Sequence, residues 1–194
     1  MRRRHNYFFL LFGLLVVLVG APASDEFTDN VHRMLVLDGT LACAFIFGIW
    51  TLVRSRKAFI AGCAIAVAFI GLDVAARIYD STMLSHLTLL CLLLFFLLSG
   101  YIAMRDVLFG GTVDVNRIVG AVCIYLLSGA IWGVVYFYLQ FYSPGAFAGV
   151  GSEAGLSPLG DLTYYSFVTL TTLGFGDISP ISPLAKTLSY LEGG

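Results

Sequence analysis

Charged residues are scarce in this sequence. Only 12% of its 194 residues are Asp, Glu, Lys or Arg, whereas ordinary soluble domains carry about 25%. The net charge is −1, and no run of like charge is longer than three residues. This composition excludes a disordered chain, a collagen-like chain and a protein that binds nucleic acid through a basic surface.

Patterns typical of metal sites, disulfides and catalytic residues are also missing. The chain has three histidines and four cysteines, and their spacing fits no metal site. Each cysteine falls in an apolar stretch, where it behaves as a small hydrophobic residue: Cys43, Cys63, Cys91 and Cys123. No Ser/His/Asp set and no pair of histidines suited to haem is apparent. We therefore expect neither an enzyme nor a bound cofactor.

Apolar residues are abundant instead. They make up 59% of the chain, and the mean hydropathy is +0.90. A helix needs about 20 apolar residues to cross a bilayer, and five stretches approach or exceed that length. They predict an all-α integral membrane protein, a helical bundle with full spans at residues 7–23, 34–53, 58–76, 83–104 and 118–140.

The first of these stretches has two interpretations. A basic start, a short apolar region and the small residues Ala21-Pro22-Ala23 also fit a cleaved secretory signal peptide. We favour a retained span, because proline weakens the cleavage site and further spans follow. The topology downstream is the same in both cases.

The basic residues predict the orientation, because cytoplasmic loops are enriched in Lys and Arg. With the N-terminus in the cytoplasm, eight of the eleven basic residues lie on the cytoplasmic side: Arg2, Arg3, Arg4, Arg54, Arg56, Lys57, Arg105 and Arg117. The fifth span then ends on the outer face of the membrane.

Three regions follow from these spans. Residues 1–104 form a four-span N-terminal membrane domain. Residues 105–117 form a cytoplasmic connector, in which Gly110-Gly111 breaks the helix. Residues 118–194 form the third region, with an external loop at 141–160. Within it we expect a short helix over 162–172, capped by Asp161, and the start of a truncated sixth span over 184–191.

The segment from Thr169 to Pro180 carries the functional signal. A short helix that enters the membrane from outside directs its partly negative carbonyl end at the membrane centre, which favours a cation there. Gly174 and Gly176 allow positive φ at alternate positions, so successive carbonyl groups can face one side. Several such strands around one axis form rings of oxygen atoms that replace the hydration shell of a cation.

These residues, Thr-Leu-Thr-Thr-Leu-Gly-Phe-Gly-Asp at 169–177, resemble the signature of the potassium-channel pore family, T-x-x-T-V-G-Y-G-D. The resemblance runs from the fifth span to residue 192, and the earlier spans resemble six-span bacterial members in layout only. It implies a homotetramer in a bacterial inner membrane that conducts K⁺ passively, with no cofactor. The implied filter residues are Thr172, Leu173, Gly174, Phe175 and Gly176, with K⁺ bound by the backbone of the first four. Asp177 lies at the outer mouth, and Tyr165, Thr169 and Thr171 provide support from the pore helix.

Two departures from the family pattern affect the filter. Val168 stands where some members carry an acid that braces the outer aspartate, so we expect Tyr165 to donate a hydrogen bond to Asp177 instead. Phe175 lacks the hydroxyl of the usual tyrosine. Both changes predict a less rigid filter. The alternative function is a non-conducting membrane subunit, or a truncated fragment, that assembles with full-length channel subunits.

The first four spans give weaker signals. The fourth contains no Lys or Arg before Arg105, so voltage sensing by a charged fourth helix is excluded. Asp38, Asp73, Arg77 and His86 fall at similar depths near the outer face, and we interpret them as an ion pair that joins helices, with proton-linked gating through His86 as the alternative. In the fifth span, Gly129 and Gly133 form a small-xxx-small pattern, which we expect to face the inner helix or a neighbouring span.

Overall fold

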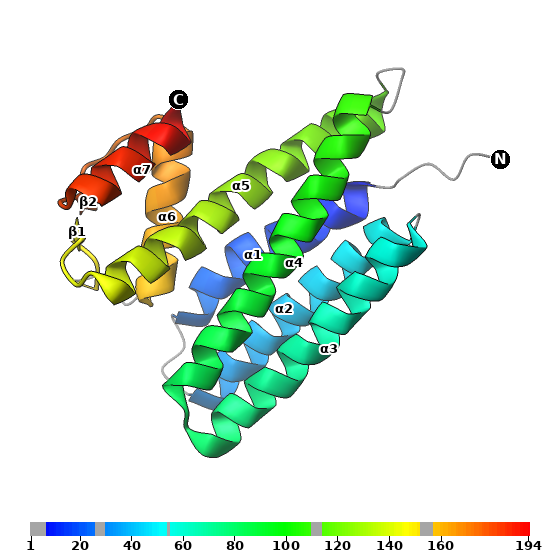
Figure 1. Ribbon diagram of the computed structural model, residues 1–194, viewed down its shortest axis with the longest axis horizontal. Helices are drawn as coiled ribbons and strands as arrows, with labels where there is room; N and C mark the ends of the chain where they lie inside the picture. The colour runs from blue at the N-terminus through cyan, green and yellow to red at the C-terminus, as the bar shows by residue number, and fades with distance from the viewer. Residues whose placement is uncertain (1–6, 26–29, 54, 110–113, 152–156) are drawn as a thin grey trace. The chain divides into compact units, whose positions relative to one another are not determined.

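The computed structural model describes residues 7–25, 30–53, 55–109, 114–151 and 157–194. Figure 1 shows the order of its elements. The helices are α1 (Tyr7–Asp25), α2 (Asn30–Leu52), α3 (Arg56–Tyr79), α4 (Thr82–Phe109), α5 (Val115–Tyr142), α6 (Pro158–Leu170) and α7 (Pro183–Gly193). The strands are β1 (Phe147–Ala148) and β2 (Ser179–Pro180). Arg2, Arg3, Arg4, Arg54 and Gly110-Gly111 lie outside the described residues.

Within the described residues, five helices, α1 to α5, are long and apolar enough to cross a membrane. Each expected span falls on one of them, which confirms the prediction of an all-α integral membrane protein. The fourth span is longer than expected, because α4 continues to Phe109 and includes the first residues assigned to the connector. Residues 101–109 contain no glycine or proline, so the helix continues past Arg105.

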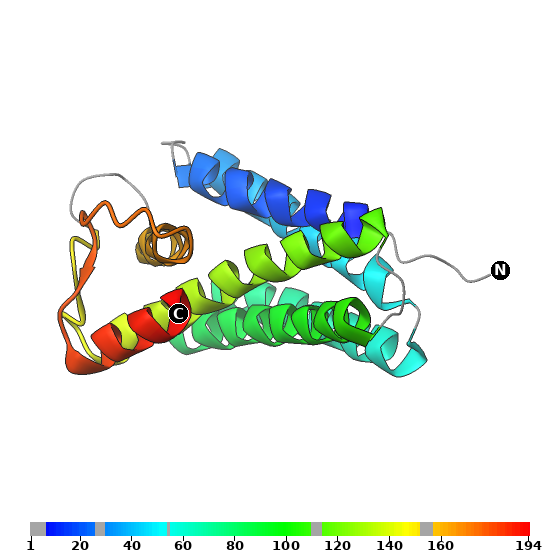
Figure 2. The ribbon, with the colours of Figure 1, turned by 90° about the horizontal axis from the view of Figure 1, so that it is seen from above.

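The chain divides into two compact units, Met1–Gly20 with Leu37–Leu127, and Ala21–Val36 with Ser128–Gly194. In the first unit, α3 and α4 lie side by side and antiparallel (Figures 1 and 2). Asp80 ends α3 in a left-handed conformation, and its backbone N–H bonds to Ala76. Phe45 packs against Phe69 and Phe95, with ring centroids 4.8 and 4.5 Å apart.

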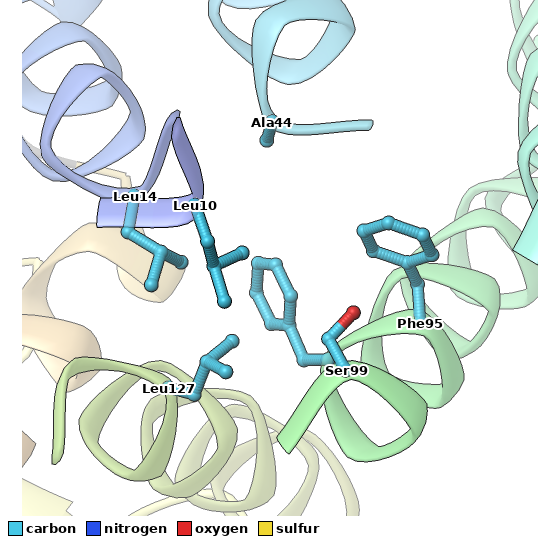
Figure 3. Close-up of a pocket in the computed structure, with 7 residues that line it drawn as sticks. Leu10, Leu14, Ala44, Phe95, Ser99 and Leu127 are labelled. Atoms are coloured by element: carbon cyan, nitrogen blue, oxygen red, sulfur yellow. The ribbon is translucent and has the colours of Figure 1, made fainter. Parts of the chain in front are cut away.

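The first unit also contains a small apolar cavity (Figure 3). Leu10 and Leu14 of α1, Phe95 of α4 and Leu127 of α5 line it. Ser99 contributes its one polar side chain, and the buried hydroxyl has no hydrogen-bond partner among the described residues.

The second unit contains the end of α5, the two strands, α6 and α7. Its core consists of side chains from α5, β1, α6 and α7 and from the residue that precedes each strand: Tyr136, Ala146, Phe147, Leu162, Tyr165, Ile178 and Ala185. The strands pair antiparallel, with Phe147 opposite Pro180 and Ala148 opposite Ser179. The pairing fastens the loop before α6 to the segment that follows Asp177.

Candidate functional site: the re-entrant helix and the glycine segment

The short helix α6 begins four residues earlier than expected. Ser157 is its N-cap, and the Ser157 hydroxyl accepts a hydrogen bond from the N–H of Gly160. Pro158 occupies the first turn, where its missing N–H costs nothing. The assignment of Asp161 as N-cap is therefore wrong. Asp161 is buried in the first turn, and its carboxylate accepts a 2.6 Å hydrogen bond from the N–H of Gly151.

Two glycines of α5 allow α6 to pack closely against it. An added Cβ on Gly133 would lie 2.8 Å from the Cα of Thr163, and one on Gly129 would lie 2.7 Å from the ring of Phe167. The expected small-residue contact therefore exists, but its partner is the short helix α6 rather than the inner helix or another span. Close approach also lets the Ser166 hydroxyl donate to the Gly129 carbonyl at 2.9 Å.

Aromatic rings fill the space between α5, β1 and α6. The rings of Tyr136, Phe147 and Tyr165 meet edge to face, with centroids 5.2 to 5.3 Å apart. Such contacts stabilise an assembly beyond the area that they bury. They fix the position of α6 relative to the end of α5.

The expected filter begins directly at the carboxyl end of α6. The N–H of Thr172 bonds to the carbonyl of Thr169, and the N–H of Leu173 bonds to that of Val168. Thr171 is the C-cap, and its hydroxyl donates to the carbonyl of Phe167 at 2.6 Å. Thr169 and Thr171 thus lie at the carboxyl end of α6, and the supporting role expected of them stays a prediction.

In residues 172–176, which we call the glycine segment, the sign of φ alternates as predicted, with positive values at both glycines. The φ angles are 58° at Gly174 and 81° at Gly176. Thr172 also has a positive φ, 59°, which the sequence did not predict. A non-glycine residue rarely adopts this conformation, so the alternation extends over three positions at a conformational cost.

The glycine segment is exposed on a single chain. The side chains of Leu173 and Phe175 are 60% and 66% exposed. An added Cβ on Gly174 or Gly176 would meet no atom within 4 Å. The constraint on these two glycines within one chain is therefore conformational rather than steric.

The hydrogen bond expected from Tyr165 to Asp177 is absent. Tyr165 donates to the Ser189 hydroxyl of α7 at 2.7 Å instead. The preceding residue, Tyr164, bonds to Asp177, and this hydrogen bond raises the pKa of the Tyr164 phenol. Asp177 is thus contacted by α6, but through Tyr164 rather than Tyr165.

Glu192 is a residue that the sequence reasoning missed. It lies buried on α7, where its carboxyl group contacts the hydroxyls of Tyr136 and Ser166. The sequence does place this acidic residue at the end of an apolar stretch, and ionisable residues in membrane helices usually have a function. The helix expected over 184–191 ends one residue before Glu192.

In the first unit, the predicted ion pair exists and is shared by two helices. Arg77 of α3 contacts both carboxylate oxygens of Asp38 on α2, at 3.0 and 2.5 Å. It also contacts Asp73, one turn away on α3, at 2.7 Å. The role expected for His86 stays a prediction.

The C-terminal part of the chain is similar to a known protein family. Residues 121–193 match a protein-family model described as Ion channel (Ion_trans_2). No curated protein and no solved structure shows a significant match to the chain. The matched family is one of channels rather than enzymes. The match covers the glycine segment, α6, α7 and α5 from Ala121 onward, so this part of the integral membrane protein is similar to an ion channel domain.

Proposed function

We propose that the chain is a subunit of a tetrameric channel that conducts K⁺ passively through the backbone of residues 172–176. One observation carries the proposal: positive φ at Thr172, Gly174 and Gly176 in a segment that directly follows the carboxyl end of α6. Alternating conformations of this kind allow neighbouring carbonyl groups to face one side, as a row of cation ligands requires.

The electrostatics of α6 favour the same ion. The carboxyl end of a helix carries about half a negative charge, and the glycine segment begins there. The carbonyl groups of Thr172, Leu173, Gly174 and Phe175 supply the ligands, and no cofactor is needed. Asp177, braced by Tyr164, attracts cations at the outer mouth.

Exposure of the glycine segment supports assembly into a tetramer. Irregular backbone at membrane depth is tolerated only where protein or a water-filled cavity surrounds it. A single chain leaves residues 171–177 exposed, so partner subunits enclose them. The protein lies in a bacterial inner membrane with its N-terminus in the cytoplasm and Asp177 on the outer face.

Ion flux into liposomes tests this function. The full-length protein, reconstituted with a K⁺ gradient, passes K⁺ faster than Na⁺, and a Gly174→Ala variant of equal insertion passes neither. Equal K⁺ and Na⁺ flux would contradict selectivity. No flux from a protein that nevertheless assembles with a conducting channel subunit would favour the non-conducting role.

A further inference from the structure

Glu192 connects three helices of the ion channel domain. Its side chain is on α7, the Tyr136 hydroxyl that donates to Oε2 is on α5, and the Ser166 hydroxyl that contacts Oε1 is on α6. Tyr136 and Ser166 are both fully buried. The carboxyl group therefore lies at the junction of α5, α6 and α7.

The hydrogen bonds at this junction require one more proton than an ionised carboxylate provides. The Ser166 hydroxyl has a single hydrogen, but its oxygen lies within hydrogen-bonding distance of both the Gly129 carbonyl and Oε1 of Glu192. A carbonyl and a carboxylate can only accept. If Glu192 is protonated on Oε1, it donates to Ser166, Ser166 donates to Gly129, and Tyr136 donates to Oε2. Every group is then satisfied.

The charges around the junction agree with a neutral acid. The nearby titratable groups are phenols, Tyr136 on α5 and Tyr165 of α6, whose ring packs against that of Tyr136. No ion pair to Glu192 is present among the described residues. A buried carboxylate without a cation is strongly unfavourable, whereas a buried carboxylic acid with two hydroxyl partners, Tyr136 and Ser166, is not.

A short series of hydrogen bonds joins the Glu192 junction to the glycine segment. Ser166 lies in the second half of α6, and the hydrogen bond from Tyr165 to Ser189 joins the same two helices one residue away. The carboxyl end of α6 in turn holds the first two residues of the filter through the N–H groups of Thr172 and Leu173. A displacement of α7 from α6 would therefore reach the filter through a few hydrogen bonds.

We propose that Glu192 is a positioning residue that acts in its protonated form, joining α7 to α5 and α6 and so holding the pore helix in its conducting position. This inference rests on the proposed function, because its readout in flux needs a conducting pore. Loss of the proton places an uncompensated charge at the junction, which separates α7 from α6. Conduction is therefore present when Glu192 is protonated and lost as the pH rises through its titration.

Flux measured from about pH 4 to about pH 9 tests the role of the proton. In the unchanged protein, flux falls with rising pH above the midpoint, by up to about tenfold per pH unit for each subunit whose loss of a proton stops conduction. Glu192→Gln, a neutral side chain that can accept from Tyr136 and donate to Ser166, retains flux and removes this fall. Glu153→Gln, the same change in the expected external loop, keeps the fall and is the matched control.

Infrared spectroscopy gives a second readout that needs no conduction. The C=O stretching band of a protonated acid is expected in the unchanged protein and absent from Glu192→Gln. If flux is normal but both proteins share one pH profile, or if the band is missing, the role of Glu192 is wrong and the channel proposal stands. If the band is present and no K⁺ passes at any pH, the channel proposal falls while the protonated junction stands.

Discussion

A Cβ added to Gly149 would lie 2.2 Å from the carbonyl oxygen of Asp177, so the loop before α6 touches the backbone that directly follows Gly176. Gly149 also has a φ of 85°. Both facts restrict this position to glycine.

We expect Gly149→Ala to displace Asp177 and to abolish selective flux. Gly145→Ala is the matched control, because Gly145 has nearly the same φ, 86°, but open space around its Cβ position. Both variants incur the conformational cost of about 1–2 kcal/mol, and only Gly149→Ala adds the collision. Equal flux from the two variants would show that the contact with Asp177 has no functional role.

Gly174→Ala and Gly176→Ala should abolish K⁺ flux while leaving membrane insertion intact. Each alanine disfavours positive φ by about 1–2 kcal/mol, and a tetramer incurs that cost in every subunit. Phe175→Tyr should be tolerated, since it only adds a hydroxyl to an exposed ring. Liposome flux and the yield of inserted protein measure both effects. Normal K⁺ flux in both glycine variants would show that residues 172–176 do not line the pore.

Tyr164→Phe should lower K⁺ selectivity over Na⁺, because it removes the hydrogen bond to Asp177. Tyr165→Phe, the same change on the neighbouring residue, removes the bond to Ser189 instead and leaves Asp177 braced. The ratio of K⁺ to Na⁺ flux in the two variants separates these roles. An identical loss in both would indicate general damage to α6.

The hydrogen bond between Tyr164 and Asp177 also predicts a loss of selectivity at alkaline pH. The hydrogen bond raises the pKa of Tyr164 above its usual value of about 10. A raised pKa means that the stabilisation is fully present below about pH 10 and is lost as the pH rises through the raised value. Selectivity should therefore fall in strong alkali in the unchanged protein and stay flat in Tyr164→Phe. A parallel fall in both proteins would contradict this assignment.

Arg77→Lys should lower the stability of the protein in detergent by about 1 kcal/mol, because an ammonium group cannot bind Asp38 through two parallel hydrogen bonds. Arg77→Gln should cost more, since it leaves Asp38 and Asp73 without a cation. Thermal unfolding measures both effects, with Arg56→Gln at the other end of α3 as the control. Equal unfolding temperatures for all three variants would show that the ion pairs contribute nothing.

Cysteines introduced near Gly151 and near Arg105 should react with an impermeant thiol reagent from opposite sides of the membrane. The positive-inside rule places Gly151 outside and Arg105 inside. Reaction of both from one side would overturn the proposed orientation, and the entry of α6 from outside with it.

The spans could be predicted because crossing a bilayer needs a long apolar run, and few other structures produce one. The start of α6 was missed because Leu162 begins the apolar pattern, whereas Ser157 and Pro158 set the first turn. The brace on Asp177 was assigned to Tyr165 because sequence does not fix the rotation of a helix. Neighbours on a helix point about 100° apart, and aromatic packing turns Tyr165 toward α7. Glu192 was missed because its partners lie on two other helices.

The pairing of β1 with β2 closes residues 149–178 into a loop whose two ends are fastened together. The entropy of closing such a loop grows only with the logarithm of its length, by about 0.6 kcal/mol for each doubling. We therefore expect an insertion between Gly151 and Ser157 to cost little free energy of folding, provided that the pairing of β1 with β2 and the Ser157 N-cap are retained. In the proposed channel, the loop that faces the outside can therefore vary in length and composition without moving the backbone of residues 172–176.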